Sequence, residues 1–263
     1  MAATTHNMFL NSIPIDKDMT VHDIVSRDYR TADVFRKYEI EYCCGGKLPL
    51  QIACDNRGVD TDKVIRDLQQ ATRDIQISSS NIDFNDWDID FITDFIVNVH
   101  HQSIRKALPQ LKLHLDQFAE GHKKKFPYIE ELQRSVNQFS KTVLVHMEQE
   151  EEIIFPYIKQ IAHAYHSRAS YASLLVRTLR KPVDDIKQHE HDVTARMLKR
   201  WRELTDNYTA PAHACISHQV VFKKFREVDN DIVQHLFLEN EILFPKAINM
   251  EKELLHNNGQ DSI

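Results

Sequence analysis

Long stretches of the chain carry apolar residues at intervals of three and four, the spacing that places side chains on one face of an α-helix. Four such stretches follow one another, at residues 86–120, 128–164, 168–206 and 213–250. Pro109 lies inside the first stretch and should kink it, and Pro182 should kink or split the third. We expect the four stretches to pack as an antiparallel four-helix bundle.

Shorter helical patterns precede this bundle. They cover about Thr31 to Tyr38, Leu50 to Asn56 and Asp60 to Ile75, with Gly58 ending the second. The 263 residues include only five glycines and eight prolines, which argues against a β-rich, turn-rich protein. We therefore expect an all-α fold, with a small helical domain at residues 16–77 and the bundle domain at residues 85–250.

Two of the long apolar stripes are interrupted by the same polar pair. Each contains His-x-x-x-Glu followed at the same distance by Phe-Pro, as His146 with Glu150 and as His235 with Glu239. The first stripe is Leu132, Val136, Phe139, Val143, His146, Glu150, Ile153 and Tyr157, and the second is Val221, Phe225, Val228, Ile232, His235, Glu239 and Ile242. The two Phe-Pro pairs predict matched breaks in the helices.

A buried, ionised glutamate is costly unless a cation or strong donors meet it. One His–Glu pair could simply satisfy itself, but two copies at equal spacing indicate a shared cation. His101 and His191 precede the two copies by nearly equal distances, so the chain has the pattern of a duplicated helical hairpin. The stripe of the first helix is Val97, His101, Ile104, Leu108, Leu111 and Leu115.

These positions predict a metal centre in the core of the bundle. The candidate ligands are His101, His146, Glu150, His191, His235 and Glu239. One metal with six ligands is possible, but the repeat favours two metals bridged by the two glutamates. Imidazole and carboxylate suit iron or manganese and tolerate zinc, whereas structural zinc sites are often rich in cysteine. We favour a di-iron centre.

The composition of the chain argues against several kinds of partner and location. The net charge is −6 and there is no long basic run, so we expect no nucleic-acid binding. The chain has no apolar run of about 18 residues and no signal-peptide pattern at its start, so we expect a cytoplasmic protein without a membrane segment. Four cysteines in a chain this long do not form a disulfide framework.

Cys43 and Cys44 are adjacent, next to Gly45 and Gly46. Such a pair can bind a metal or nitric oxide or exchange disulfides, and the nearby Lys37 and Lys47 favour the thiolate. The alternative is that both behave as small buried hydrophobic residues. Cys54 and Cys215 lie in helical sequence and are expected to serve packing.

Together these motifs resemble the iron–sulfur cluster repair di-iron proteins, the RIC or ScdA/YtfE-type family, whose main domain is hemerythrin-like. The resemblance covers about Asp18 to Lys246. It rests on Val34–Gly46, which includes the Cys-Cys-Gly-Gly motif, on His100-His101 followed by Leu108-Pro109, on His191 within Glu190-His191-Asp192, and on the two His-x-x-x-Glu copies with their Phe-Pro tails. By this resemblance, His101 is the ligand of the first helix and His191 that of the third.

The resemblance implies two non-haem irons bridged by the two carboxylates, and we expect an oxo bridge as well. From the residues themselves we expect Cys43 and Cys44 to be a redox or nitric oxide-reactive pair. The resemblance implies repair of iron–sulfur proteins damaged by nitric oxide or peroxide, through iron donation or nitric oxide chemistry. The oligomeric state stays open between a monomer and a homodimer. A hemerythrin-like protein that binds or senses oxygen or nitric oxide, and a nitric oxide reductase, remain alternatives. Ala195 stands where an oxygen carrier has another histidine, which favours reactivity or iron release.

The other polar residues near these motifs have ordinary explanations. We expect Glu148, Glu151 and Glu152 to form a solvated acidic face, and His114 and His218 to lie at the surface or to cap helices. His100 is expected to face away from the site or to support it from behind.

Overall fold

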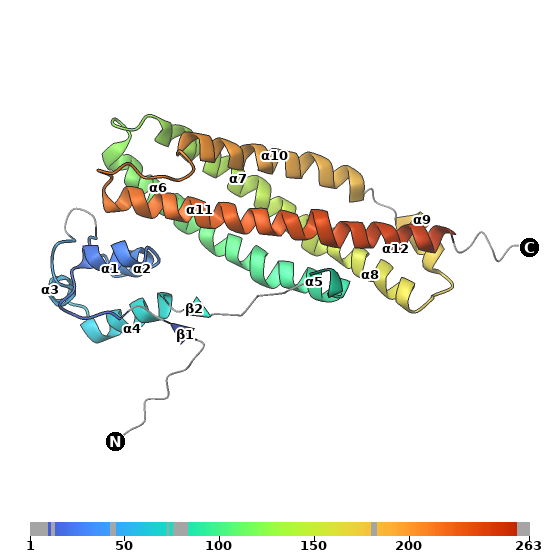
Figure 1. Cartoon of the computed structure of the whole chain (residues 1–263), viewed down its shortest axis with the longest axis horizontal. Coiled ribbons are helices and arrows are strands. Elements are labelled where there is room, and N and C mark those ends of the chain that lie inside the picture. The colour runs from blue at the N-terminus through green and yellow to red at the C-terminus, as the bar shows by residue number, and fades with distance from the viewer. Residues whose placement is uncertain are drawn as a thin grey trace, which may run out of the picture. The chain divides into compact units, whose positions relative to one another are not determined.

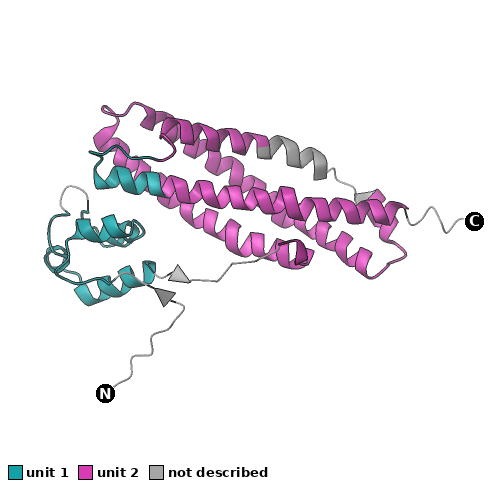
Figure 2. Ribbon diagram, viewed as in Figure 1, with its two compact units in different colours: residues 1–82, 209–223 teal, residues 83–208, 224–263 magenta. Residues whose placement is uncertain are grey.

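The computed structural model describes residues 10–11, 14–42, 46–72, 74–75, 84–179 and 183–256, with only the backbone for residues 10–11, 74–75, 178–179 and 183–191. The chain divides into two compact units (Figure 2). Unit 1 comprises residues 1–82 and 209–223, and unit 2 comprises residues 83–208 and 224–263. Apart from one two-residue β ladder, all regular structure in the described part of the chain is helical, which confirms the all-α prediction.

Unit 1 consists of short helices whose ends are set by local hydrogen bonds. The Thr20 hydroxyl accepts a hydrogen bond from the Asp23 amide at 3.0 Å, and Asp60 caps the fourth helix in the same way. Gly58 turns the chain between the third and fourth helices with a φ of +65°, a value that favours glycine. The elements are β1 (Leu10–Asn11), α1 (Val21–Arg27), α2 (Thr31–Lys37), α3 (Leu50–Asp55), α4 (Thr61–Ala71) and β2 (Asp74–Ile75), with β1 antiparallel to β2.

The core of unit 1 is small and aliphatic around one aromatic ring. Phe35 is fully buried among residues of α1 to α4, and Cys54 lies in the same core as a packing residue, as expected. Ile216 and Val220, from the part of the chain after residue 208 that belongs to unit 1, also line this core. Cys43 and Cys44 lie outside the described residues, so the functional interpretation of this pair stays a prediction.

Gly46 is held against the backbone of the same motif. A Cβ atom added to Gly46 would lie 2.3 Å from the carbonyl oxygen of Tyr42, and backbone atoms cannot move aside as a flexible side chain can. We expect Gly46→Ala to lower the free energy of unfolding of unit 1 by about 1–3 kcal/mol through overpacking. Gly121→Ala is the matched control, because a Cβ there meets open space. Thermal unfolding followed by circular dichroism distinguishes them, and equal melting temperatures would contradict the prediction.

Unit 2 is built from long helical segments that run side by side (Figure 1). Helix α6 packs on α7, α7 on α10, and α12 on α8 and α9. The elements are η1 (Phe84–Asp86), α5 (Ile89–Phe95), η2 (Ile96–His101), α6 (Gln102–His122), α7 (Tyr128–Gln149), η3 (Glu150–Ile154), α8 (Phe155–His166), α9 (Ala172–Leu179), α10 (Val183–Leu204), α11 (Ile216–Phe237), η4 (Leu238–Leu243) and α12 (Phe244–His256). Residues 216–223 of α11 are counted with unit 1.

The predicted breaks at the two Phe-Pro pairs are π-helical turns within continuous helices. In η3 the amide of Phe155 donates to the carbonyl of Glu150, and in η4 the amide of Phe244 donates to the carbonyl of Glu239. Each bond reaches back five residues instead of four, just before a proline that has no amide to donate. The duplication seen in the sequence therefore extends to the backbone hydrogen bonds. A third π-helical turn, η2, ends at His101.

These turns shift the apolar stripes by one residue, which corrects two core predictions. Ile153 is 41% exposed, and its neighbour Ile154 is 5% exposed and takes the core position. Val97 is likewise only half-buried, whereas Ile96 is fully buried. A π-helical turn contains one more residue than an α-helical turn. A stripe predicted with the α-helical period is therefore displaced by one residue where such a turn occurs.

Two histidine predictions were also wrong. His114 and His218 are buried rather than at the surface. His114 lies between Leu111 and Phe118 on the inward face of α6, and His218 packs edge-on against Phe222 with ring centroids 4.4 Å apart. Both histidines lie at α-helical spacing from buried apolar neighbours, and this spacing predicts an inward-facing position.

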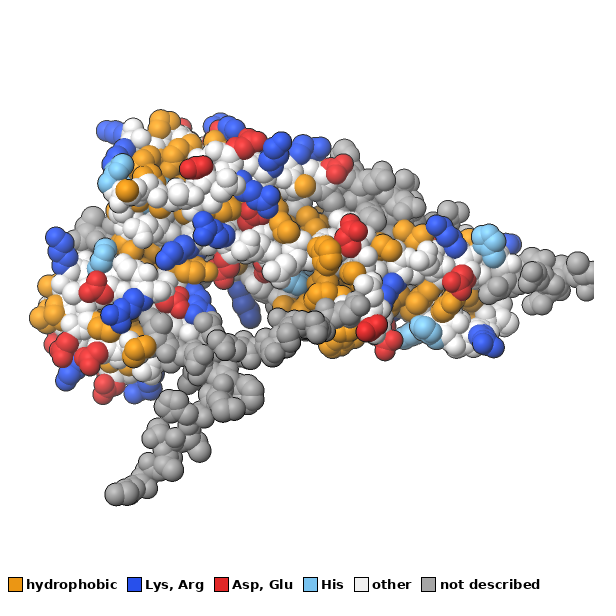
Figure 3. All heavy atoms as spheres, viewed as in Figure 1, with side chains coloured by type: hydrophobic (Ala, Val, Ile, Leu, Met, Phe, Trp, Pro, Cys, Tyr) orange, Lys and Arg blue, Asp and Glu red, His pale blue; other side chains and the backbone are white. Residues whose placement is uncertain are grey.

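The surface of the described residues mixes charge types. Figure 3 shows acidic, basic and apolar side chains interspersed over the visible face. Among the helices that the structure describes, none is both long enough and apolar enough to cross a lipid bilayer.

Candidate metal centre

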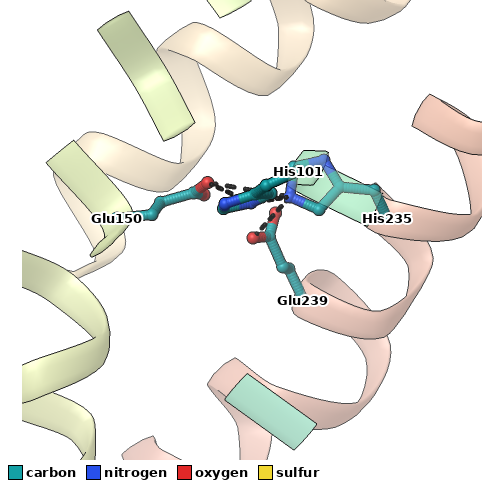
Figure 4. A group of neighbouring side chains, drawn as sticks. All are labelled: His101, Glu150, His235 and Glu239. Carbon is teal, nitrogen blue, oxygen red and sulfur yellow. Dashed lines mark hydrogen bonds and ion pairs between the residues drawn. The ribbon is translucent and has the colours of Figure 1, made fainter. Parts of the chain in front are cut away.

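Four of the predicted ligands meet in the interior of unit 2. They are His101, Glu150, His235 and Glu239, and their side chains point toward one another (Figure 4). One donor atom from each lies within 4.8 Å of those from all the others. All four side chains are completely or almost completely buried. The cluster thus joins residues from helices that are distant in the sequence.

Local structure places each of these side chains. His101 is the last residue of η2, Glu150 is the first residue of η3, and Glu239 lies in η4 one turn after His235. Each of the three segments that carry these four side chains thus has a π-helical turn at the site. Such turns are rare in proteins overall but occur frequently at functional sites.

Glu150 is the most connected member of the cluster. Its Oε1 lies 2.9 Å from Nε2 of His146, and its Oε2 lies 3.4 Å from Nε2 of His101. Its Oε2 is also 3.6 Å from Nε2 of His235. A single carboxylate therefore faces imidazoles from three different helical segments.

His235 joins the two halves of the cluster. Its Nε2 lies 2.9 Å from Oε1 of Glu239 and 3.1 Å from Nε2 of His101. The two imidazole rings meet edge to face, with centroids 4.9 Å apart. Nitrogen and oxygen donors thus converge from both copies of the repeated motif.

The charges of the cluster shift the pKa values strongly. Burial lowers the pKa of His146 and of His235, but the adjacent carboxylates outweigh it and raise them to about 9 and about 10. Burial raises the pKa of Glu150, yet three imidazoles hold it well below its usual range. Burial, followed by the charge of Glu150, raises the pKa of Glu239 to about 7. Protons on His146 and His235 supply positive charge that the carboxylates require.

This donor set fits a metal ion. A cation bound between the carboxylates would replace the imidazole protons as the compensating charge, and neutral imidazoles would then serve as ligands. Imidazole nitrogen and carboxylate oxygen are ligands that suit first-row transition metals. The buried cluster has the chemistry of a cation-binding site.

The other predicted ligands have different outcomes. His146 is buried and reaches the cluster through Glu150. The backbone of His191 lies in α10, but its side chain is outside the described residues. Its role as a ligand therefore stays a prediction.

The sequence interpretation missed the role of Glu151, which was assigned to a solvated acidic face together with Glu148 and Glu152. Its Oε1 accepts hydrogen bonds from Nδ1 of His101 at 2.6 Å and from the Arg105 guanidinium at 2.7 Å. Burial raises the pKa of Glu151, but these two bonds outweigh it and keep the pKa below its usual value. The only sequence signal was that Glu151 is adjacent to Glu150.

His100 supports the site from behind, one of the two roles expected for it. Its Nδ1 lies 2.5 Å from Oδ1 of Asp231, and its ring stacks on that of His235 with centroids 6.3 Å apart. His100, hydrogen-bonded to Asp231, packs against the cluster without being part of it.

Comparisons with known proteins agree with this architecture. Residues 92–247 match the family model of the hemerythrin HHE cation-binding domain. Residues 17–72 match the ScdA N-terminal domain, a domain of unknown function. The two matches fall on the helices of the metal cluster and on the short helices before them.

Curated relatives match across both regions. The chain is 32% identical to the iron–sulfur cluster repair protein YtfE of Edwardsiella ictaluri, covering 83% of this chain and 91% of the relative. It is 30% identical to YtfE of an Enterobacter species, covering 88% and 97% respectively. It is 28% identical to ScdA of Staphylococcus haemolyticus, covering 88% and 99%. The chain therefore belongs to the iron–sulfur cluster repair protein family of the ScdA and YtfE type, with a hemerythrin HHE cation-binding domain as its larger part.

Proposed function

We propose that this protein repairs iron–sulfur clusters damaged by nitric oxide or peroxide, using two irons held in unit 2. The proposed ligands are His101, His146, Glu150, His191, His235 and Glu239. The observation that carries the proposal is the pair of fully buried carboxylates, one from each copy of the repeat, in one cluster with imidazoles. Family membership supports the same activity, because the curated relatives are named as cluster repair proteins.

The protein side chains have separate tasks in this proposal. Glu150 faces imidazoles from three segments, so its carboxylate would be a shared ligand for metal held by those histidines. The apolar core around the cluster excludes bulk water and strengthens its electrostatic interactions. Bound iron would supply the metal that a damaged cluster has lost and a site where nitric oxide can bind.

We also propose how the chain is divided. Residues 16–77 form the ScdA-type domain, and residues 85–250 form the hemerythrin-like bundle. The two family matches, at residues 17–72 and 92–247, support this division. Cys43 and Cys44 are proposed as a redox or nitric oxide-reactive pair within the smaller domain.

The test is whether the purified protein restores the activity of a damaged iron–sulfur enzyme. The full chain, loaded anaerobically with Fe²⁺ and desalted, should carry two irons and restore the activity of a [4Fe–4S] hydratase that nitric oxide has inactivated. Free Fe²⁺ at the same concentration is the control and should restore much less. Repair equal to that of free iron, or a chain that binds no iron after reconstitution, would overturn the proposal.

The same preparation separates repair from nitric oxide reduction. Iron donation consumes the bound metal, so repair should stop when the irons have been transferred. Catalytic turnover of nitric oxide with an added electron donor, without loss of iron, would assign the centre to nitric oxide reduction instead.

A further inference from the structure

A carboxylate and a guanidinium lie directly behind one imidazole of the cluster. Oε1 of Glu151 is 2.6 Å from Nδ1 of His101 and 2.7 Å from Nη1 of Arg105. Arg105 lies one helical turn after His101, and Glu151 directly follows Glu150 in the π-helical turn η3. The Glu151 and Arg105 side chains are 26% and 31% exposed, so this group links the buried cluster to the surface.

The geometry decides which ring nitrogen faces the cluster. A neutral imidazole has one N–H and one lone pair. Because Nδ1 of His101 donates to the Glu151 carboxylate, a neutral His101 would present its lone pair to a metal at Nε2, which lies 3.4 Å from Glu150 and 3.1 Å from His235. A carboxylate behind a ligand histidine fixes the tautomer and the ring orientation and makes the imidazole a stronger donor.

In the register of the sequence repeat, the second copy carries no charged residue at either of these two positions. Aligning Glu150 with Glu239 in sequence pairs Glu151 with Asn240, and aligning His101 with His191 pairs Arg105 with Ala195. Both charged residues of the first copy therefore correspond to uncharged residues in the second. An amide withdraws a proton from an imidazole much less strongly than a carboxylate does.

We propose that Glu151, held by Arg105, is a positioning residue for His101 and makes the two metal positions unequal. The metal bound through His101 is retained, and the metal at the other end of the site is the exchangeable one that leaves first. This inference rests on the proposed di-iron centre and states which of its irons is available for donation.

Iron release measures this inequality without an assay of repair. The full chain is loaded anaerobically with Fe²⁺, and the coloured complex with an excess of an Fe²⁺ chelator is followed over time. We expect two phases of equal amplitude from the unmodified protein. In Glu151→Gln, which keeps the shape and removes the charge, the slow phase should become about 10- to 100-fold faster. Arg105→Gln should act in the same direction to a smaller extent, because it leaves the carboxylate in place.

Glu152→Gln is the matched control. Glu152 is the exposed neighbour of Glu151 and has the same formal charge. Release from this variant should match that from the unmodified protein. If Glu151→Gln also releases both irons at the unmodified rates, the inference is overturned while the di-iron centre stands. If the unmodified protein binds no iron, the proposed centre fails and the inference fails with it.

A second measurement needs no metal. In the metal-free protein, the proton on Nδ1 of His101 should give a strongly downfield proton NMR signal, because it is held in a short bond to a carboxylate. That signal should disappear in Glu151→Gln and persist in Glu152→Gln, with circular dichroism showing the same helix content in both. Persistence of the signal in Glu151→Gln would contradict the tautomer assignment.

Discussion

Glu150→Gln should leave the protein unable to retain its metal. Glu150 is fully buried and faces His101, His146 and His235, so its charge is the largest single attraction for a cation in the cluster. The glutamine keeps the volume but offers one neutral oxygen in place of two charged ones, and three imidazoles then surround a site without their main counter-charge. We expect iron content to fall from two per chain to close to zero, and cluster repair to disappear with it.

The measurement is metal content and the optical spectrum after purification without added metal. An oxo-bridged di-ferric absorption in the unmodified protein should be missing in the variant. Glu148→Gln is the control, since Glu148 lies on the exposed side of the same helix and should keep full iron content. Two irons per chain in Glu150→Gln would show that the duplicated motif does not bridge a metal pair.

Trp201→Ala should cause the largest loss of stability in unit 2. Trp201 is fully buried, packs edge-on against Phe139 at 4.7 Å and Phe225 at 5.1 Å, and donates its indole N–H to Ser135 at 2.7 Å. It joins α10 to α7 and α11, so alanine leaves a cavity between three helices. We expect the free energy of unfolding to fall by about 3–5 kcal/mol, the usual cost of removing a large buried aromatic ring.

Chemical denaturation followed by circular dichroism gives this free energy. Leu144→Ala serves as the comparison, because Leu144 is 40% exposed on α7 and its truncation should cost much less. Both measurements should be made on the metal-free protein, since bound iron adds its own stabilisation to the folded state. A loss below about 1 kcal/mol for Trp201→Ala would mean that the ring is not part of the cooperative core.

In the function that we propose, the donor set would suit release of metal more than reversible gas binding. Ala195 removes one imidazole that an oxygen carrier has at this position, and Glu239 supplies a second buried carboxylate. Fewer nitrogen donors and more carboxylate make the donor set harder. In our proposal, Glu151 and Arg105 make the site hold one of the two metals more firmly, which leaves the other metal easier to release.

The sequence predicted most of the fold because its signals are local. The three- and four-residue spacing of apolar side chains located the long helices, and the repeat of His-x-x-x-Glu identified a cluster whose members come from both hairpins. The second stripe, from Val221 to Ile242, is buried at every position. These features depend on the period of a helix and on the cost of burying a charge, both of which can be judged without coordinates.

Only the tertiary structure determined the π-helical turns and what they move. An α-helical period placed Ile153 in the core, whereas the added residue of η3 exposes Ile153 and buries Ile154. The same turn directs Glu150 and its neighbour Glu151 toward the metal cluster, one to its centre and one behind His101. The sequence therefore determined which residues could bind a cation. The packing of helices that are distant in the chain decided which carboxylate faces the cation and which one orients its histidine.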